Sequence, residues 1–395
     1  MTSTKTKTYK DINFFRSEIS AGVCIFFAVF FSLLVNNSSA STYYLKFFES
    51  VVFSFAKQKF TITDFINNVF MLLFFLLMTI ELKKEFLIGE LTISKRIIFA
   101  VFACMGSILG AIIVFYITSY NQLSNIEGFF TSCLTDGALF YCLVKLCGNF
   151  FSNRIIAIVL AMTAINNAVF VILIGTFYSS SEYVYLFLFV SVFVCFFIFK
   201  YCNFYNIYVY ILTTSVLWFL LWLCHVPQVL AGIILGAFIP LKHHHKPVAI
   251  KIAKQISPIV DFFVLPIFVF ANTGLNLNNF QLEYLLQPMV ISVVLSILIG
   301  KQMGFLLFIA IINKLKITQI PKKIGWLKVY CLAIFSSLSF SCGLFFNSVL
   351  FKENLPLLNQ TKLSLILVNF FIAFWGLLLV FIIKTFSKKN EALYL

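Results

Sequence analysis

The residues most able to do chemistry are polar and charged side chains inside long apolar runs. Two adjacent asparagines, Asn166 and Asn167, lie in the run LAMTAINNAVFVILIG at residues 160–175. Asp136 and Lys301 each lie within another such run, and Asp261 lies near the start of a third. Ionisable groups in membrane spans are costly, and they mark ion pathways, proton relays or charge compensation. These residues therefore predict a site that handles charge inside a membrane.

Some polar groups in these runs also have an ordinary structural explanation. Glu81 and Glu85 share one face at the end of an apolar run, interleaved with lysines, as many helix ends at a membrane surface do. Three other asparagines, Asn67, Asn68 and Asn272, are explained well by hydrogen bonds between helices. Asp136 and Lys301 form either one buried pair or two charges that separately neutralise other groups.

The elements that must hold these residues are membrane-spanning helices. The chain has 395 residues, of which 61% are hydrophobic and 11% are charged, and a soluble domain carries about 25% charged residues. The runs are near or above the length of about 18 to 20 residues that a spanning helix needs. About twelve spans are predicted, and the eighth is short: 19–35, 62–82, 97–118, 126–147, 155–177, 183–203, 205–223, 226–241, 258–275, 288–312, 328–350 and 363–384.

The distribution of basic residues predicts how the spans are oriented. With an internal N-terminus, the inside segments hold 23 of the 29 Lys and Arg residues, the outside loops hold five, and Lys301 lies within a span. Short basic loops stay in the cytoplasm. We therefore expect cytoplasmic segments at 1–18 and 387–395 on either side of a membrane domain at 19–386. The net charge of +15 then indicates contact with anionic lipids rather than with nucleic acid.

The sequence contains no pattern typical of an enzyme. No catalytic triad, phosphate-binding loop or nucleotide motif is visible. The ten cysteines show no Cys-x-x-Cys pair and no metal-ligand spacing, so they are interpreted as small buried apolar residues. No cofactor and no metal centre are expected.

Five motifs resemble the NhaA family of bacterial sodium/proton antiporters. They are FFLLMTIELKKEFLIGEL (74–91), LTDGALF (134–140), LAGIILGAFIPLK (230–242), LPIFVFANTGLNL (265–277) and LIGKQMGF (298–305). All five occur in the family's order and with similar spacing, over roughly residues 10–385. Five motifs in register are much more specific than any one of them.

The resemblance implies an all-α polytopic membrane protein with two inverted three-helix repeats. The repeats are spans 3 to 5 and spans 10 to 12, and spans 4 and 11 are interrupted and cross. Thr135, Asp136 and Gly137 provide a polar interruption in span 4, and the run FSSLSFSCG (335–343) provides one in span 11. Broken helices leave unpaired ends with partial charges, which an anion and a cation relieve. Asp136 and Lys301 match the family's residues at these positions. A homodimer in the bacterial inner membrane is also implied.

The ion site departs from the family pattern. At Asn166 and Asn167 the family's electrogenic antiporters carry two aspartates, which hold either protons or a sodium ion. An amide does not titrate, although its oxygen is still able to bind a hard cation. Further differences are Asn68 in place of an acidic residue, Pro227 in place of a histidine, Ser132 in place of a proline, and Ser337 and Ser339 in place of glycines.

Three functions follow from this comparison. The first is a sodium/proton antiporter that moves Na+ or Li+ out and H+ in. Asp136 would then be the titratable anion, with Thr135, Asn166 and Asn167 as oxygen ligands and with Glu81 and Glu85 at a pH-responsive entrance. The second is a degenerate homologue that does not transport, and the third is a carrier or leak with altered coupling.

Cysteine labelling in intact cells tests the predicted topology. Single cysteines at Asn121 and Asn278 should react with a membrane-impermeant maleimide added outside, whereas cysteines at Lys246 and Ile320 should react only after the membrane is permeabilised. Labelling of position 320 from outside would contradict the twelve-span arrangement.

Overall fold

The chain folds almost entirely into helices. The computed structural model describes residues 12–55, 58–119, 127–177, 183–202, 204–224, 226–243, 246–277, 281–317 and 325–393. Within these residues the β structure consists of one antiparallel hairpin, β1 (Val51–Phe55) and β2 (Gln58–Thr61), and an isolated bridge between His243 and Lys246. The hairpin and the preceding helix α2 (Ser41–Glu49) occupy a segment where the sequence predicted no element.

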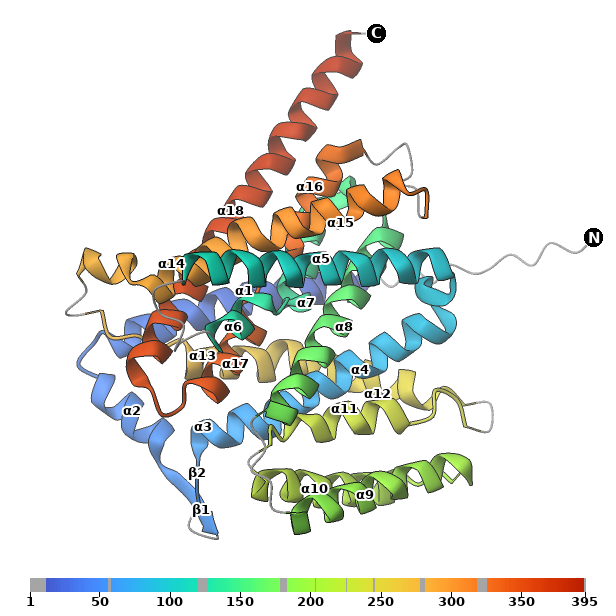
Figure 1. Cartoon of the computed structure of the whole chain (residues 1–395), viewed down its shortest axis with the longest axis vertical. Coiled ribbons are helices and arrows are strands. Elements are labelled where there is room, and N and C mark those ends of the chain that lie inside the picture. Colours follow the sequence, from blue (N-terminus) through green and yellow to red (C-terminus); the bar gives the residue numbers. More distant parts are fainter. Residues whose placement is uncertain are drawn as a thin grey trace, which may run out of the picture.

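The helices follow one another in three groups, shown in Figure 1. The first group begins with α1 (Ile12–Asn36). After it, α3 (Ile62–Phe65), the π-helical segment η1 (Ile66–Phe70) and α4 (Met71–Ile88) form one continuous helical run. The second group comprises η2 (Glu90–Thr92), α5 (Ser94–Thr118), α6 (Phe129–Cys133), α7 (Gly137–Leu146), η4 (Gly148–Phe150), α8 (Asn153–Phe177), α9 (Tyr183–Tyr201), α10 (Ile207–Leu223) and α11 (Val229–Phe238). The third comprises α12 (Val248–Ile259), η5 (Val260–Val264), α13 (Leu265–Asn272), η6 (Leu282–Leu286), α14 (Pro288–Leu295), η7 (Ser296–Lys301), α15 (Gln302–Lys314), α16 (Gly325–Ser336), α17 (Ser341–Leu350) and α18 (Leu355–Leu393).

These helices confirm the prediction of an all-α polytopic membrane protein. Among the described residues, eight helical runs are long and apolar enough to cross a membrane. A further bent pair, Ser20–Asn36 and Ser41–Glu49, and three shorter apolar helices bring a helix to each of the twelve predicted ranges. The short eighth range becomes α11, a helix of ten residues. Large apolar side chains remain exposed on many of these helices, as expected for surfaces that face lipid.

Two predicted spans are interrupted and cross each other. The first interruption separates α6 from α7 at residues 134–136, and the second separates α16 from α17 at residues 337–340. The backbone N–H of Asp136 donates to the carbonyl of Leu338 at 2.8 Å, so the two interruptions touch. Asp136 interrupts its span because its side chain caps a new helix, α7. At the second break, the hydroxyls of Ser336 and Ser337 donate to backbone carbonyls of the preceding turn and so compete with backbone N–H groups for them.

Close packing of glycines fixes the helices on either side of the crossing. A Cβ on Gly304 would lie 2.0 Å from the carbonyl oxygen of Gly106, and one on Gly110 would lie 2.1 Å from that of Gly300. Because Gly106 meets Gly304 while Gly110 meets Gly300, α5 runs antiparallel to η7 and α15. Figure 1 shows α5 and α15 side by side. This opposed direction is the arrangement that inverted repeats require.

Three π-helical segments carry polar residues of the spans. Asn67 and Asn68 lie in η1, Asp261 lies in η5 and Lys301 ends η7. The helical run that contains η5 begins at Val248, ten residues before the predicted start of the ninth span at 258. Pro258 inside α12 explains why regular hydrogen bonding is lost there and a π segment follows. Such segments often occur where a helix must turn a side chain toward a functional site.

The glycine contacts predict which small substitution destabilises the fold. Gly304→Ala should lower the free energy of unfolding by about 1 to 3 kcal/mol, because the added methyl group meets backbone that has no room to move. Gly175→Ala is the matched control, since its new Cβ would meet the flexible end of the Leu230 side chain. Thermal midpoints in detergent measure both effects. Equal losses for the two variants would contradict the importance of this contact.

Candidate functional site

Asp136 joins the N-terminal ends of two helices at the crossing. Its side chain is fully buried. One carboxylate oxygen accepts hydrogen bonds from the N–H groups of Ala138 and Leu139, each at 3.1 Å, at the start of α7. The other oxygen accepts from the N–H of Ser341 at 2.7 Å, at the start of α17. A single negative charge therefore lies between two helix N-termini, whose unpaired N–H groups carry partial positive charge.

Lys301 contacts the opposite ends of the interrupted spans. It is also fully buried, and its ammonium group donates to the carbonyl oxygen of Leu134 and, at 3.0 Å, to that of Ser337. Leu134 follows α6 and Ser337 follows α16, so both carbonyls lie at helix C-termini with partial negative charge. Lys301 and Asn167 are not hydrogen-bonded to each other in the described part of the chain.

Asn167 is hydrogen-bonded to the first interruption. Its amide nitrogen donates to the carbonyl of Thr135 at 2.8 Å, and its oxygen accepts from the N–H of Thr135 at 3.2 Å. The nitrogen also lies 3.2 Å from the sulfur of Cys342 at the start of α17. The side chain is fully buried. An aspartate at this position would lack the donor that holds the Thr135 carbonyl.

Asn166 is bonded through one end of its amide only. Its nitrogen donates to the carbonyl of Cys133 at 2.8 Å and to the hydroxyl of Thr135 at 3.0 Å. Its oxygen is buried and has no hydrogen-bond partner in the described part of the chain. Because both partners of the nitrogen are acceptors, this assignment of the amide atoms is the favourable one. The structure therefore leaves one buried amide oxygen free beside Thr135.

Ser339 holds the second interruption in place. The hydroxyl of Ser339 donates to the carbonyl of Thr131 in α6 at 2.8 Å, and its N–H donates to the side chain of Asn369 in α18 at 2.8 Å. Sequence reasoning identified the polar interruption but assigned no partners to Ser339, Ser341 or Cys342. Only the run FSSLSFSCG signalled that this segment was unusual.

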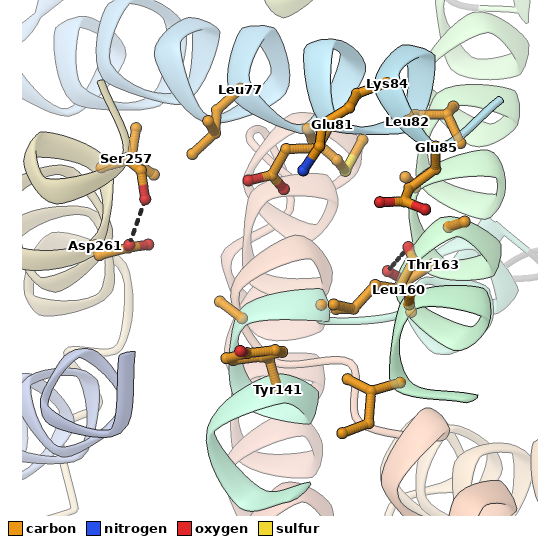
Figure 2. Close-up of a pocket in the computed structure, with 18 of the residues that line it drawn as sticks. Leu77, Glu81, Leu82, Lys84, Glu85, Tyr141, Leu160, Thr163, Ser257 and Asp261 are labelled. Carbon is orange, nitrogen blue, oxygen red and sulfur yellow. Dashed lines mark hydrogen bonds between the residues drawn. The ribbon is translucent and has the colours of Figure 1, made fainter. Parts of the chain in front are cut away.

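A cavity of about 450 Å³ leads from charged residues toward the crossing. Figure 2 shows Glu81, Lys84 and Glu85 projecting from α4 toward it, across from Asp261 and Tyr141. The hydroxyl of Ser257 donates to Asp261 at 3.0 Å, and the carboxylate of Glu85 accepts from the N–H of Glu90 at 2.9 Å.

The inner wall of this cavity adjoins the crossing. It includes Gly137 and Ala138, which follow Asp136 directly, and Thr163 and Ala164, which lie in α8 just before Asn166. The structure thus brings Thr135, Asp136, Asn166, Asn167 and Lys301 together at the crossing. Glu81 and Glu85 lie separately, in the cavity wall.

Removal of the buried carboxylate should destabilise the protein. Asp136→Ala leaves three buried N–H groups without their acceptor and Lys301 without a nearby negative charge, so we expect a loss of about 3 to 5 kcal/mol in the free energy of unfolding. Glu353→Ala is the control, because this acid is exposed next to α17. Thermal unfolding in detergent compares them, and equal midpoints would show that Asp136 does not stabilise the helix ends.

Comparison with known proteins agrees with this geometry. The family model for Na+/H+ antiporter 1 matches residues 12–380. The chain is 28% identical over 375 residues to the Na(+)/H(+) antiporter NhaA 2 of Campylobacter jejuni, covering 93% of this chain and 98% of that protein. It is 26% identical over 382 residues to the Na(+)/H(+) antiporter NhaA of Pelagibacter ubique, covering 95% and 97%. From the interrupted, crossing spans and this match along nearly its whole length, the chain belongs to the Na+/H+ antiporter 1 family.

Proposed function

We propose that this chain is a secondary transporter of the bacterial inner membrane that exchanges Na+ or Li+ for H+, with the metal ion moving out and the proton moving in. The main observation in support of this proposal is the free oxygen of Asn166. It is buried beside a crossing of two interrupted helices, and residues next to that crossing, among them Ala138 and Ala164, line a cavity with charged walls. Family membership and the names of the relatives support the same activity.

The proposed ion site consists of Asp136, Thr135, Asn166 and Asn167. Hard cations prefer oxygen ligands, and the site offers the free oxygen of Asn166, the hydroxyl of Thr135 and the carboxylate of Asp136. Asp136 supplies the negative charge that offsets dehydration of a monovalent cation. Lys301 balances the helix C-termini at the same crossing, so that the scaffold stays in place while the ion is exchanged.

The entrance is proposed to lie at Glu81 and Glu85. Both carboxylates line the cavity on the side of α4, and they would attract cations and respond to pH before an ion reaches the crossing. Lys84 and Lys145 line the same cavity. Because basic residues favour the cytoplasmic side, this cavity is proposed to open to the cytoplasm.

The remaining organisation is proposed on the same basis. We place segments 1–18 and 387–395 in the cytoplasm, on either side of a membrane domain at 19–386, and the basic cytoplasmic loops against anionic lipid head groups. The homodimer implied by the family resemblance stays a prediction.

A carrier with altered coupling is the second candidate. Both amide nitrogens of the asparagine pair donate to groups of the first interruption, so these side chains are fixed and carry no exchangeable proton. Proton exchange would then depend on Asp136, and the number of protons moved per sodium ion would differ from that of a two-carboxylate site.

Sodium-driven proton movement in everted vesicles tests the proposal. Vesicles from a host without its own antiporters should lose a preformed acid interior when Na+ or Li+ is added, but not when K+ is added at equal ionic strength. The Asp136→Asn variant should lose at least about 90% of this response if it inserts normally, because the site then has no negative charge. Correctly inserted parent protein that behaves like empty vesicles would contradict antiport and favour a homologue that does not transport. Uptake of Na+ without proton movement would favour the altered carrier.

Restoring carboxylates should increase exchange. In the double variant Asn166→Asp and Asn167→Asp, two carboxylates face the carbonyls of Cys133 and Thr135, so a proton or a cation must lie between these oxygens. We expect sodium/proton exchange to rise at least about tenfold, which corresponds to about 1.4 kcal/mol.

Asn347→Asp is the matched control for charge, since this buried asparagine lies in α17 and bonds to Leu358 and Thr361. A similar rise in the control, or no rise in a folded double variant, would contradict the assignment of the asparagine pair to the ion site.

A further inference from the structure

Two polar contacts join α17 and the turn that follows it to the helical run α3–η1–α4, far from the cavity. The ammonium of Lys352 lies 2.6 Å from a carboxylate oxygen of Asp64. The amide nitrogen of Asn67 donates to the hydroxyl of Ser348 at 3.1 Å. We refer to these four residues as the latch.

The two contacts are in register on facing segments. Asp64 and Asn67 are three residues apart on one helical run and therefore share one helix face. Ser348 lies in the last turn of α17, and Lys352 lies in the turn that follows this helix. Asp64 contacts Lys352 and Asn67 contacts the earlier residue Ser348, so α17 and the run are antiparallel and the contacts lie at two levels.

Asp64 and Asn67 are also held in place by contacts that do not involve Ser348 or Lys352. The second carboxylate oxygen of Asp64 accepts from the N–H and hydroxyl of Thr61 at 3.1 and 2.9 Å. Asn67 and Asn272 of α13 exchange two amide hydrogen bonds at 3.2 and 2.8 Å. Changes at Ser348 or Lys352 therefore break the contact across the interface and leave the α3–η1–α13 side intact.

The latch and the cavity lie at opposite ends of the same helical run. Asp64 is near its start and Glu81 is near its end, a separation of about 25 Å along the helix axis. Deeper than the latch, the rings of Phe75 and Phe345 pack at 5.6 Å, and both are almost fully buried. At one end of this helical run a cavity therefore leads toward the crossing, and at the other end polar contacts join the run to α17 and the turn after it.

We propose that the latch holds shut the access route at the end opposite the cavity, and that it breaks each time the ion site is exposed on that side. The elements it joins are the ones that line the two sides of the route: α4 lines the cavity, and α17 begins at the crossing, where Ser341 bonds to Asp136. Opening this end separates α17 from α3 and η1, which removes both contacts. The role of the latch in transport rests on the proposed function, but its effect on access to the crossing from that side does not.

The native thiol of Cys342 reports access from the latch side. It is fully buried at the start of α17 and contacts Asn167. A membrane-impermeant methanethiosulfonate is added from the latch side, in right-side-out vesicles, or from the cavity side, in everted vesicles. Mass spectrometry of the peptide that contains Cys342 then gives the modification rate.

Weakening the latch should shift this reactivity toward the latch side. We expect modification from the latch side to rise about threefold in Lys352→Gln, which loses a mostly exposed ion pair, and about tenfold in Ser348→Ala, which loses a partly buried hydrogen bond. Modification from the cavity side should fall or stay unchanged. Lys352→Arg should restore the parent rate, and Lys46→Gln, which removes an exposed lysine of α2, should leave it unchanged.

The possible results separate the latch from the proposed function. Unchanged rates in Lys352→Gln and Ser348→Ala, or equal rises from both sides, would overturn the latch even if the protein exchanges sodium for protons. A rise from the latch side alone would support it even if no exchange is found.

Discussion

The structure depends on the neutralisation of four helix ends inside the membrane. Two spans are interrupted at the same place, so their unpaired N–H and C=O groups lie where water cannot satisfy them. Asp136 accepts from three N–H groups at two N-termini, and Lys301 donates to two carbonyls at C-termini. Each charge is also costly alone, so the crossing and the two charges stabilise one another.

This mutual dependence explains how the crossing is stabilised with two neutral asparagines, Asn166 and Asn167, beside it. The asparagine pair bonds to groups of the first interruption, and Ser339 ties the second interruption to α6. These contacts favour a site that is more firmly held and less charged, with one free oxygen at Asn166.

Much of this arrangement was predictable from sequence because membrane helices appear as long apolar runs, which are easy to recognise. All twelve predicted ranges coincide with helices, and the polar residues at 135–137 and 335–343 marked the two interruptions. Asp136 and Lys301 stood out because charge is rare in apolar runs. The hairpin β1–β2 escaped prediction because it lies in a short loop segment, and the start of α12 was missed because its lysines resemble a loop. The partners of Asn166, Ser339 and Ser348 depend on contacts between distant segments, which no local pattern reveals.

We propose above that a monovalent cation binds at the neutral amide pair of Asn166 and Asn167, supported by Asp136. Current recordings from purified protein in liposomes on a solid-supported membrane test it most directly. With a cation site at this position, we expect a transient current after a jump in Na+ or Li+ concentration, none after a jump in K+, and none in a correctly folded Asp136→Asn variant. Equal currents with K+, or a current that persists without the Asp136 carboxylate, would contradict it.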